Sequence, residues 1–347
     1  MELAQQVGGP LALARGLEDV DRLEPLDGYA TAMTDAVAVL LEEGVDVLQV
    51  TQAVAHVNDV LTSRVLELAE ARLGPPPYAY AWLALGSHGR GEQVLSSDQD
   101  SALAYGGPRL TAAEPDEYFP RLAGYVVEAL ARAGIPRCTG DYMATTWHHP
   151  LDTFTHYFER WVNDPAPKDL LRAEIFLDVR PVHGDLDVSS LDELLVAGGR
   201  RGTFLKQMAA ATVTFRPPVV FLGHVHTEHG YLDIKRSGTA AIVLLARLYA
   251  LAAGTNARTT LERLRVAGSA RTLSPSGVEQ MIDAYRMLTE LRLRHQVEQA
   301  RRGEAVDNRV RVDRLPSGDR RRLRDAIRTV RVMQEITANR YQTHTVT

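Results

Sequence analysis

An apolar segment that ends in Gly86-Ser87 is followed, one polar turn later, by a second apolar segment that begins with Asp98-Gln-Asp100. Both segments have the length and composition of buried strands. We therefore expect two strands, 78–85 and 100–105, that are hairpin-like partners across a glycine-rich turn. Because side chains two positions apart share one face of a strand, the carboxylates of Asp98 and Asp100 should point to one place.

Phosphate and divalent metal are the ligands that this pattern favours. Glycine leaves backbone N–H groups uncovered, so Gly86 and Ser87 are the predicted cradle for a phosphate chain. Carboxylates bind Mg²⁺, and Asp98 and Asp100 are the predicted metal ligands and catalytic residues. A phosphate cradle beside metal-binding carboxylates indicates nucleotide chemistry.

Nucleotidyl transfer calls for a third acidic group. Two metal ions clamp the attacking and the leaving oxygens in such a displacement, and two carboxylates hold both ions poorly. Asp178 is the first candidate, because it lies within a predicted strand, 172–181, where an unpaired carboxylate is costly to bury. Glu174 lies on the same face of that predicted strand and Asp141 follows a glycine, so both remain alternatives.

Arg90 and Glu92, in the turn after the first strand, have two interpretations. The forked guanidinium of Arg90 suits a triphosphate, and Glu92 would hold it in position. Alternatively, the two residues form an ion pair that stabilises the turn at the surface. We expect His88 to be a solvent-facing turn residue rather than a base.

The whole motif resembles the nucleotidyltransferase superfamily that includes DNA polymerase β. That superfamily shares an apolar residue, Gly-Ser, a spacer of roughly ten residues and a metal-binding Asp-x-Asp. The longer string Gly-Ser-x-Gly-Arg-x-Glu, with Ser-Asp-x-Asp behind it, is similar to the branch of the PII-protein uridylyltransferase and its DUF294-type relatives. The resemblance extends from about Leu26 to Tyr341.

The resemblance adds expectations for two further segments. Asp233-Ile-Lys235 is similar to an Asp-Leu-Lys of the uridylyltransferase branch, which implies that Lys235, joined by Arg247, contacts nucleotide phosphates. A helix-capping Asp and solvated cations are the alternative interpretation. The segment 138–141 departs from the Cys-Pro-Gly-Gly-like segment of the relatives, so no role is carried over to that loop.

Two functions from different classes follow. The first is an enzyme that transfers UMP or AMP from a nucleoside triphosphate to an acceptor, a signalling protein of PII type, with two Mg²⁺ ions and release of pyrophosphate. The second is a catalytically inactive nucleotide-binding sensor that uses the same pocket. The presence of both carboxylates and of the Gly-Ser turn favours the enzyme.

Composition restricts the partners. The 347 residues are 45% hydrophobic and carry a net charge of −5, which allows a sizeable core and argues against duplex nucleic acid. No apolar run reaches the roughly 20 residues of a membrane span, and the N-terminus has no secretory pattern, so we expect a cytoplasmic protein without membrane contact. The single cysteine, Cys138, forms no internal disulfide and is expected to be a small core residue. The oligomeric state is left open.

Hydrophobic periodicity predicts an α+β fold: a small polymerase-β-type sheet with helices, flanked by a helix pair and a C-terminal helical domain. The expected parts are 1–75 (N-terminal helical segment), 76–188 (catalytic domain) and 189–347 (C-terminal helical domain). The expected helices are 28–43, 48–73, 114–133, 154–161, 237–253, 274–302 and 318–342. The last two should pack through apolar side chains: Met281, Leu288, Leu291, Val297, Leu323, Ile327, Val330 and Ile336.

Overall fold

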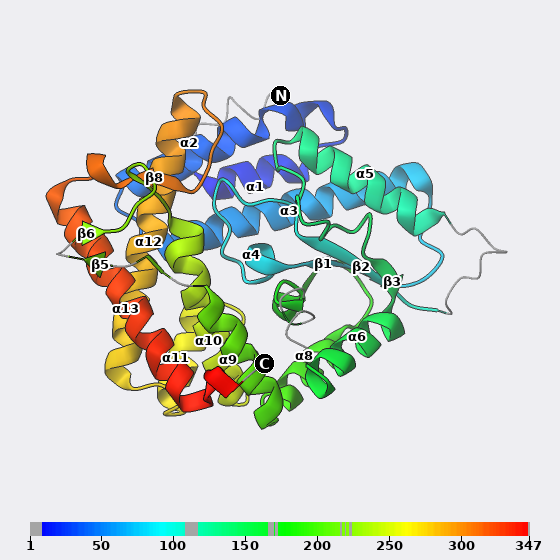
Figure 1. The fold of residues 1–347 in the computed structure, drawn as a ribbon. Coiled ribbons are helices and arrows are strands. Elements are labelled where there is room, and N and C mark those ends of the chain that lie inside the picture. Colours follow the sequence, from blue (N-terminus) through cyan, green and yellow to red (C-terminus); the bar gives the residue numbers. More distant parts are fainter. Residues whose placement is uncertain are drawn as a thin grey trace. The chain divides into compact units, whose positions relative to one another are not determined.

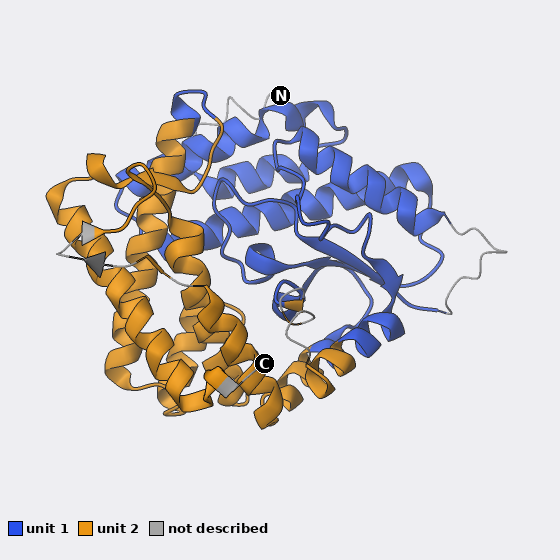
Figure 2. Cartoon of the chain, in the orientation of Figure 1, with its two compact units in different colours: residues 1–157, 174–191, 300–304 blue, residues 158–173, 192–299, 305–347 orange. Residues whose placement is uncertain are grey.

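The structure is a computed structural model in which the following residues are described: 9–107, 117–165, 170, 173–215, 217–218, 220–221 and 224–345. The chain divides into two units (Figure 2). Unit 1 contains residues 1–157, 174–191 and 300–304, and unit 2 contains residues 158–173, 192–299 and 305–347. None of the helices in the described residues is both long enough and apolar enough to cross a membrane.

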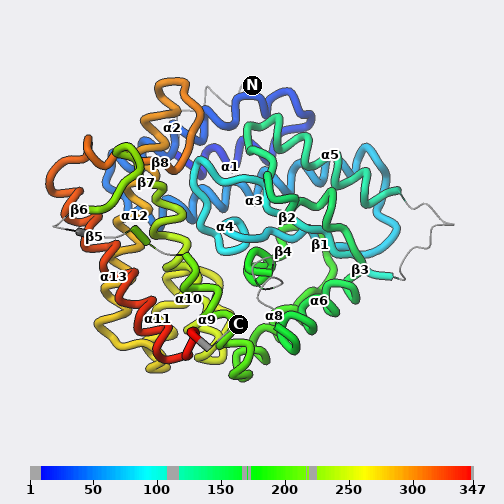
Figure 3. Tube along the Cα trace, viewed as in Figure 1, coloured from blue at the N-terminus to red at the C-terminus, as the bar shows by residue number. Residues whose placement is uncertain are grey.

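Helices of unit 1 pack on one another and beside its sheet. They include α1 (Pro10–Glu18), α2 (Tyr29–Glu42), α3 (Val47–Leu73) and α5 (Tyr118–Arg132). The predicted pair 28–43 and 48–73 is thereby confirmed, whereas α1 was not predicted. α3 begins where the Asp46 carboxylate accepts a hydrogen bond from Leu48 N (2.9 Å), and it ends at Gly74, whose φ is +91°. α3 and α5 lie side by side (Figures 1 and 3).

The sheet of unit 1 has the strand order β3-β2-β1-β4. Its strands are β1 (Tyr80–Ala84), β2 (Ser101–Tyr105), β3 (His148–Pro150) and β4 (Arg180–Gly184). β1 and β2 are antiparallel neighbours, with Tyr80 opposite Tyr105, so the predicted hairpin-like pair is confirmed. β4 is antiparallel to β1 on its other side, and β3 is parallel to β2. Helices around this small mixed sheet confirm the predicted α+β class.

The predicted strand 172–181 is wrong in its bounds. Residues 171–172 lie outside the described part, and Phe176–Asp178 form a 3-10 turn in which Val179 N donates to Phe176 O (3.0 Å). The residues of this turn are all buried, so the alternation of a strand is absent, and the ring of Phe176 packs 4.5 Å from that of Trp147. The strand begins only at Arg180, and Pro181 is accommodated because β4 is an edge strand.

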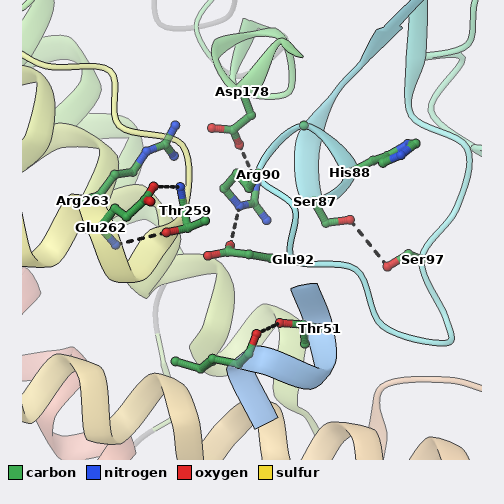
Figure 4. Close-up of polar contacts among 12 residues, drawn as sticks. Thr51, Ser87, His88, Arg90, Glu92, Ser97, Asp178, Thr259, Glu262 and Arg263 are labelled. Carbon is green, nitrogen blue, oxygen red and sulfur yellow. Dashed lines mark hydrogen bonds and ion pairs between the residues drawn. The ribbon is translucent and has the colours of Figure 1, made fainter. Parts of the chain in front are cut away.

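Unit 2 is mainly helical. Its helices include α9 (Gly202–Thr214), α10 (Ala240–Ala252), α11 (Thr260–Ser269), α13 (Ser317–Tyr341) and most of α12 (Pro275–Arg301), while α6 (Leu151–Asn163) and α8 (Ser189–Gly198) each begin in unit 1. Short strands complete it: β5 (Val220–Phe221), β6 (His224–Val225), β7 (Tyr231–Asp233) and β8 (Arg309–Arg311). α11 begins with a capping box between Thr259 and Glu262 (Figure 4).

The long helices 274–302 and 318–342 are confirmed as α12 and α13, and most of their predicted packing residues are buried. Ile336 is the exception, because 48% of its surface is exposed. The expected helix 114–133 starts at Tyr118, and residues 114–116 of that prediction lie outside the described part.

Candidate active site

The Gly-Ser motif forms a one-turn helix, α4 (Gly86–Gly89), directly after β1. Leu85 N donates to Asp100 O (3.0 Å), which holds the start of the turn against the aspartate segment. Gly86 has a φ of +53°, a conformation that glycine adopts without strain, and its N–H donates to Ile175 O (3.1 Å). The turn is thus fixed between two segments that are distant in the sequence.

Two glycines of this turn touch the candidate acids. A Cβ atom built on Gly86 would lie 2.9 Å from Asp100 Oδ2. A Cβ atom built on Gly89 would lie 1.8 Å from the carbonyl oxygen of Asp178, where no side chain fits. The backbone of the turn therefore approaches Asp100 and Asp178 as closely as only glycine permits.

Asp98 and Asp100 lie beside one another and beside Cys138. One ligand atom from each of the three residues lies within 4.8 Å of the other two. The aspartates precede β2, which starts at Ser101, so they lie at the strand entrance rather than in the strand itself, and Asp100 N donates to Asp98 O (3.1 Å). The prediction that both carboxylates reach one place is supported by this distance.

The two carboxylates of this cluster, rather than its thiol, are suited to bind a hard cation. Burial, and then the negative charge of Asp100, raise the pKa of the Cys138 thiol to about 12, so the sulfur stays protonated at neutral pH. Mg²⁺ is a hard cation that prefers carboxylate oxygens, whereas sulfur is a soft donor. Asp98 and Asp100 are therefore the residues of this cluster that suit a magnesium ion.

Arg90 links Glu92 to Asp178 (Figure 4). Its Nε donates to Glu92 Oε2 (2.9 Å) and its Nη1 donates to Asp178 Oδ2 (2.5 Å). The side chains of Arg90, Glu92 and Asp178 are 12%, 5% and 0% exposed. Arg90 and Glu92 do form the ion pair of our second interpretation, but the surface location was wrong, because the three groups form a buried bridge.

His88 points to α3, not to solvent. It is buried, and its Nε2 lies 2.7 Å from Asp59 Oδ1. Arg180 Nη2 contacts the same carboxylate oxygen (2.9 Å) and also donates to His88 O (3.1 Å), while its Nε donates to Gly89 O (3.3 Å). The prediction of a solvent-facing His88 is wrong, because a carboxylate on α3 and a guanidinium on β4 hold the turn from behind.

The charge of Asp59 is stabilised within this group. Burial alone would raise the pKa of Asp59, but the hydrogen bonds from His88 and Arg180 outweigh it and leave the pKa below 3.8. Asp59 is therefore an anion throughout the neutral range.

The comparisons with known proteins agree with this geometry. A family model described as "Putative nucleotidyltransferase DUF294" matches residues 31–168, and a second, described as "Putative nucleotidyltransferase substrate binding domain", matches residues 202–341. The chain belongs to the DUF294-type nucleotidyltransferase family. A search among curated proteins found no match.

As a DUF294-type nucleotidyltransferase, the protein has a nucleoside triphosphate as its expected substrate. The first family model includes Gly86, Asp98 and Asp100 and ends before Asp178. Neither model names the transferred base, the acceptor or the metal.

Of the remaining predicted residues of this DUF294-type chain, Ser87 lies in the Gly-Ser turn, whereas Glu174, Asp141 and Lys235 belong to other segments. Ser87 Oγ lies 3.5 Å from Ser97 Oγ, within the site (Figure 4). Glu174 is half-buried just before the 3-10 turn, and Asp141 is exposed with a φ of +60°. Lys235 belongs to unit 2, where it is exposed at the start of a π-helical turn.

Arg247 and Asp233, the other predicted residues of the unit 2 motif, differ in their surroundings. Arg247 is buried within α10, so the interpretation of this residue as a solvated cation is wrong. The Asp233 carboxylate accepts a hydrogen bond from Arg236 N (2.9 Å), as the capping interpretation expects.

Proposed function

We propose that this DUF294-type protein transfers UMP or AMP from a nucleoside triphosphate to a hydroxyl of a PII-type signalling protein in the cytoplasm, with release of pyrophosphate. The observation that carries the proposal is the cluster of Asp98 and Asp100 against the Gly86 turn. A metal held by the two carboxylates would meet phosphates bound at the turn.

Asp98 and Asp100 are the proposed ligands of two Mg²⁺ ions. When bound, such ions neutralise charge on the phosphates and activate the acceptor oxygen. The Gly86 N–H donates to Ile175 O, so the proposed cradle uses the N–H and the hydroxyl of Ser87. Gly86 contributes by having no side chain, which leaves room for the Asp100 carboxylate. The closeness of Gly86 to Asp100 supports this division of roles.

Asp178 remains our proposal for the third carboxylate, although Arg90 now contacts it. We propose that Arg90 moves from Asp178 to the triphosphate when a nucleotide binds, while Glu92 keeps its contact with Arg90 Nε. Charge balance supports this exchange, since metal would replace the guanidinium beside Asp178. From the family resemblance, Lys235 is a further proposed phosphate contact.

The test incubates the purified protein with magnesium and each α-labelled nucleoside triphosphate, with and without a PII-type protein. We expect label on that protein with the wild type, and a loss of at least about a thousandfold with Asp98→Asn or Asp100→Asn. Asp35→Asn, an exposed change on α2, is the matched control and should keep full activity.

Two results would contradict the proposal. Undiminished transfer by Asp100→Asn would exclude this carboxylate as a metal ligand. Nucleotide binding without transfer, with every triphosphate and in cell extract as well, would favour the inactive sensor.

A further inference from the structure

An open pocket of about 650 Å³ lies within unit 2, and none of the residues of the candidate active site lines it. It is formed by the ends of α10 and α11, the following loop, the start of α12 and the last turns of α13. Residues 268–275 supply most of its wall. The pocket lies within the segment matched by the substrate-binding family model, residues 202–341.

The charged side chains that line this pocket are Arg271 and Arg340, and no acidic residue lines it. Among the described residues, no carboxylate forms an ion pair with either arginine. Several other arginines of unit 2 do have such partners, as Arg258 has in Asp192. Two guanidinium groups thus line one pocket, and no carboxylate in its wall neutralises them.

The guanidinium of Arg340 is held in place. It lies 5.6 Å from the ring centroids of both Tyr249 and Tyr341, and its Nη1 donates to Thr272 O (2.5 Å). Cation–π contacts fix the group without neutralising its charge. Little side-chain entropy remains to be lost when an anion binds to it.

The rest of the wall is largely apolar. Leu273 and Met333 are buried, whereas Ile336, near the end of α13, is 48% exposed although it is an isoleucine. Contact with a ligand would remove this apolar surface from water. The pocket therefore combines an apolar wall with a fixed positive charge.

We propose that this pocket binds a small molecule that carries a phosphate group and an apolar part. A phosphate monoester has a charge of about −1.5 to −2 at neutral pH, which matches two arginines, whereas a carboxylate would neutralise one. The apolar part would lie on Ile336 and Met333. The proposal is independent of the proposed function, since binding here requires no catalysis.

The test measures binding of phenyl phosphate, inorganic phosphate and benzoate to the full chain by calorimetry. We expect phenyl phosphate to bind most tightly, followed by inorganic phosphate and then benzoate. Arg271→Ala should weaken phenyl phosphate at least about tenfold, because one of two charge-assisted contacts is lost. Arg321→Ala, an exposed change on α13 outside the pocket, should leave the affinity unchanged.

A second pair of variants separates binding from folding and from the Gly86 turn. Arg340→Lys keeps the charge but loses the fork, so it should weaken phenyl phosphate while the protein stays folded. If Ser87→Ala abolishes binding and Arg271→Ala does not, the phosphate occupies the turn and the inference is overturned. Equal affinity for benzoate and phenyl phosphate would overturn it too.

Discussion

Gly89 is the residue of the candidate site with the least room for change. A side chain there would have to displace the carbonyl oxygen of Asp178, and with it the turn that carries this carboxylate. The motif therefore fixes the position of a residue 89 positions further along the chain. Glycine is required at position 89 because the backbone there lies against the backbone of Asp178.

We expect Gly89→Ala to destabilise the protein by about 1–3 kcal/mol, because two backbone segments must separate to admit the methyl group. Urea unfolding measures this change. Gly124→Ala is the control: Gly124 is exposed within α5 and has open space, so alanine should stabilise by about 0.5–1 kcal/mol. Equal behaviour of the two variants would contradict the close approach.

Asp59→Asn tests the carboxylate behind the turn. The folded-state pKa of Asp59 is below its ordinary value of 3.8, so its contribution to stability is present above pH 3.8 and is lost as the pH falls through the folded pKa. At pH 7 the variant should be less stable by about 1–3 kcal/mol. The gap to the wild type should close in acid, as urea titrations at several pH values would show. A gap that persists below the folded pKa would contradict this origin.

The residues of the site that could be predicted are those that are contiguous in the sequence. Gly86, Asp98 and Asp100 fall in one short motif, and their types reveal their chemistry. Asp59 was missed because it lies 29 positions before His88 inside an ordinary amphipathic helix. Contacts of this kind depend on how α3 packs, and no local pattern encodes them.

At the scale of elements, α4 is a single turn that cannot be stable alone. α3 supports it through Asp59, and β4 supports it through Arg180, which contacts the last carbonyl groups of the turn. The position of the proposed phosphate cradle is thus set by elements on either side of it. Arg180 is therefore the proposed link between the sheet and the cradle.

Arg180→Lys should weaken nucleotide binding about tenfold, or roughly 1.4 kcal/mol, because a single amine cannot contact both Asp59 and the turn carbonyls. Calorimetry with a nucleoside triphosphate measures this effect. Arg137→Lys, which changes an exposed pair with Glu128, is the matched control and should have little effect. If Arg180→Lys lowers only the unfolding free energy, the contact is structural rather than positioning.

Element types were predictable where periodicity is long, as in α3, α12 and α13. The prediction failed at 172–181, where Ile175, Leu177 and Val179 alternate in the sequence as in a strand. The ring contact between Phe176 and Trp147 fixes a turn there instead. Such a contact is tertiary, so it could not be deduced from the local sequence.

For the whole molecule, the units do not correspond to consecutive stretches of sequence. The chain leaves unit 1 after Tyr157 and returns at Glu174 to add the 3-10 turn and β4. β1 therefore pairs with a strand, β4, that the chain forms only after residues 158–173 have passed through unit 2. The first family model ends at residue 168, before this strand.

A chain of residues 9–168 should aggregate, whereas residues 9–191 should stay in solution. Without β4, the five buried residues of β1 become an edge strand with unpaired backbone groups. Size-exclusion chromatography of the two purified chains provides the measurement. If both chains elute as monomers, β1 does not need its second neighbour.

Cys138 gives this molecule an intrinsic reporter. It is the single cysteine of the chain, it is buried, and its sulfur lies beside Asp98 and Asp100. A thiol reagent therefore reports on one location without any engineered label. The rate of its reaction measures how often the loop around the carboxylates opens, and a ligand that closes this loop should slow the reaction.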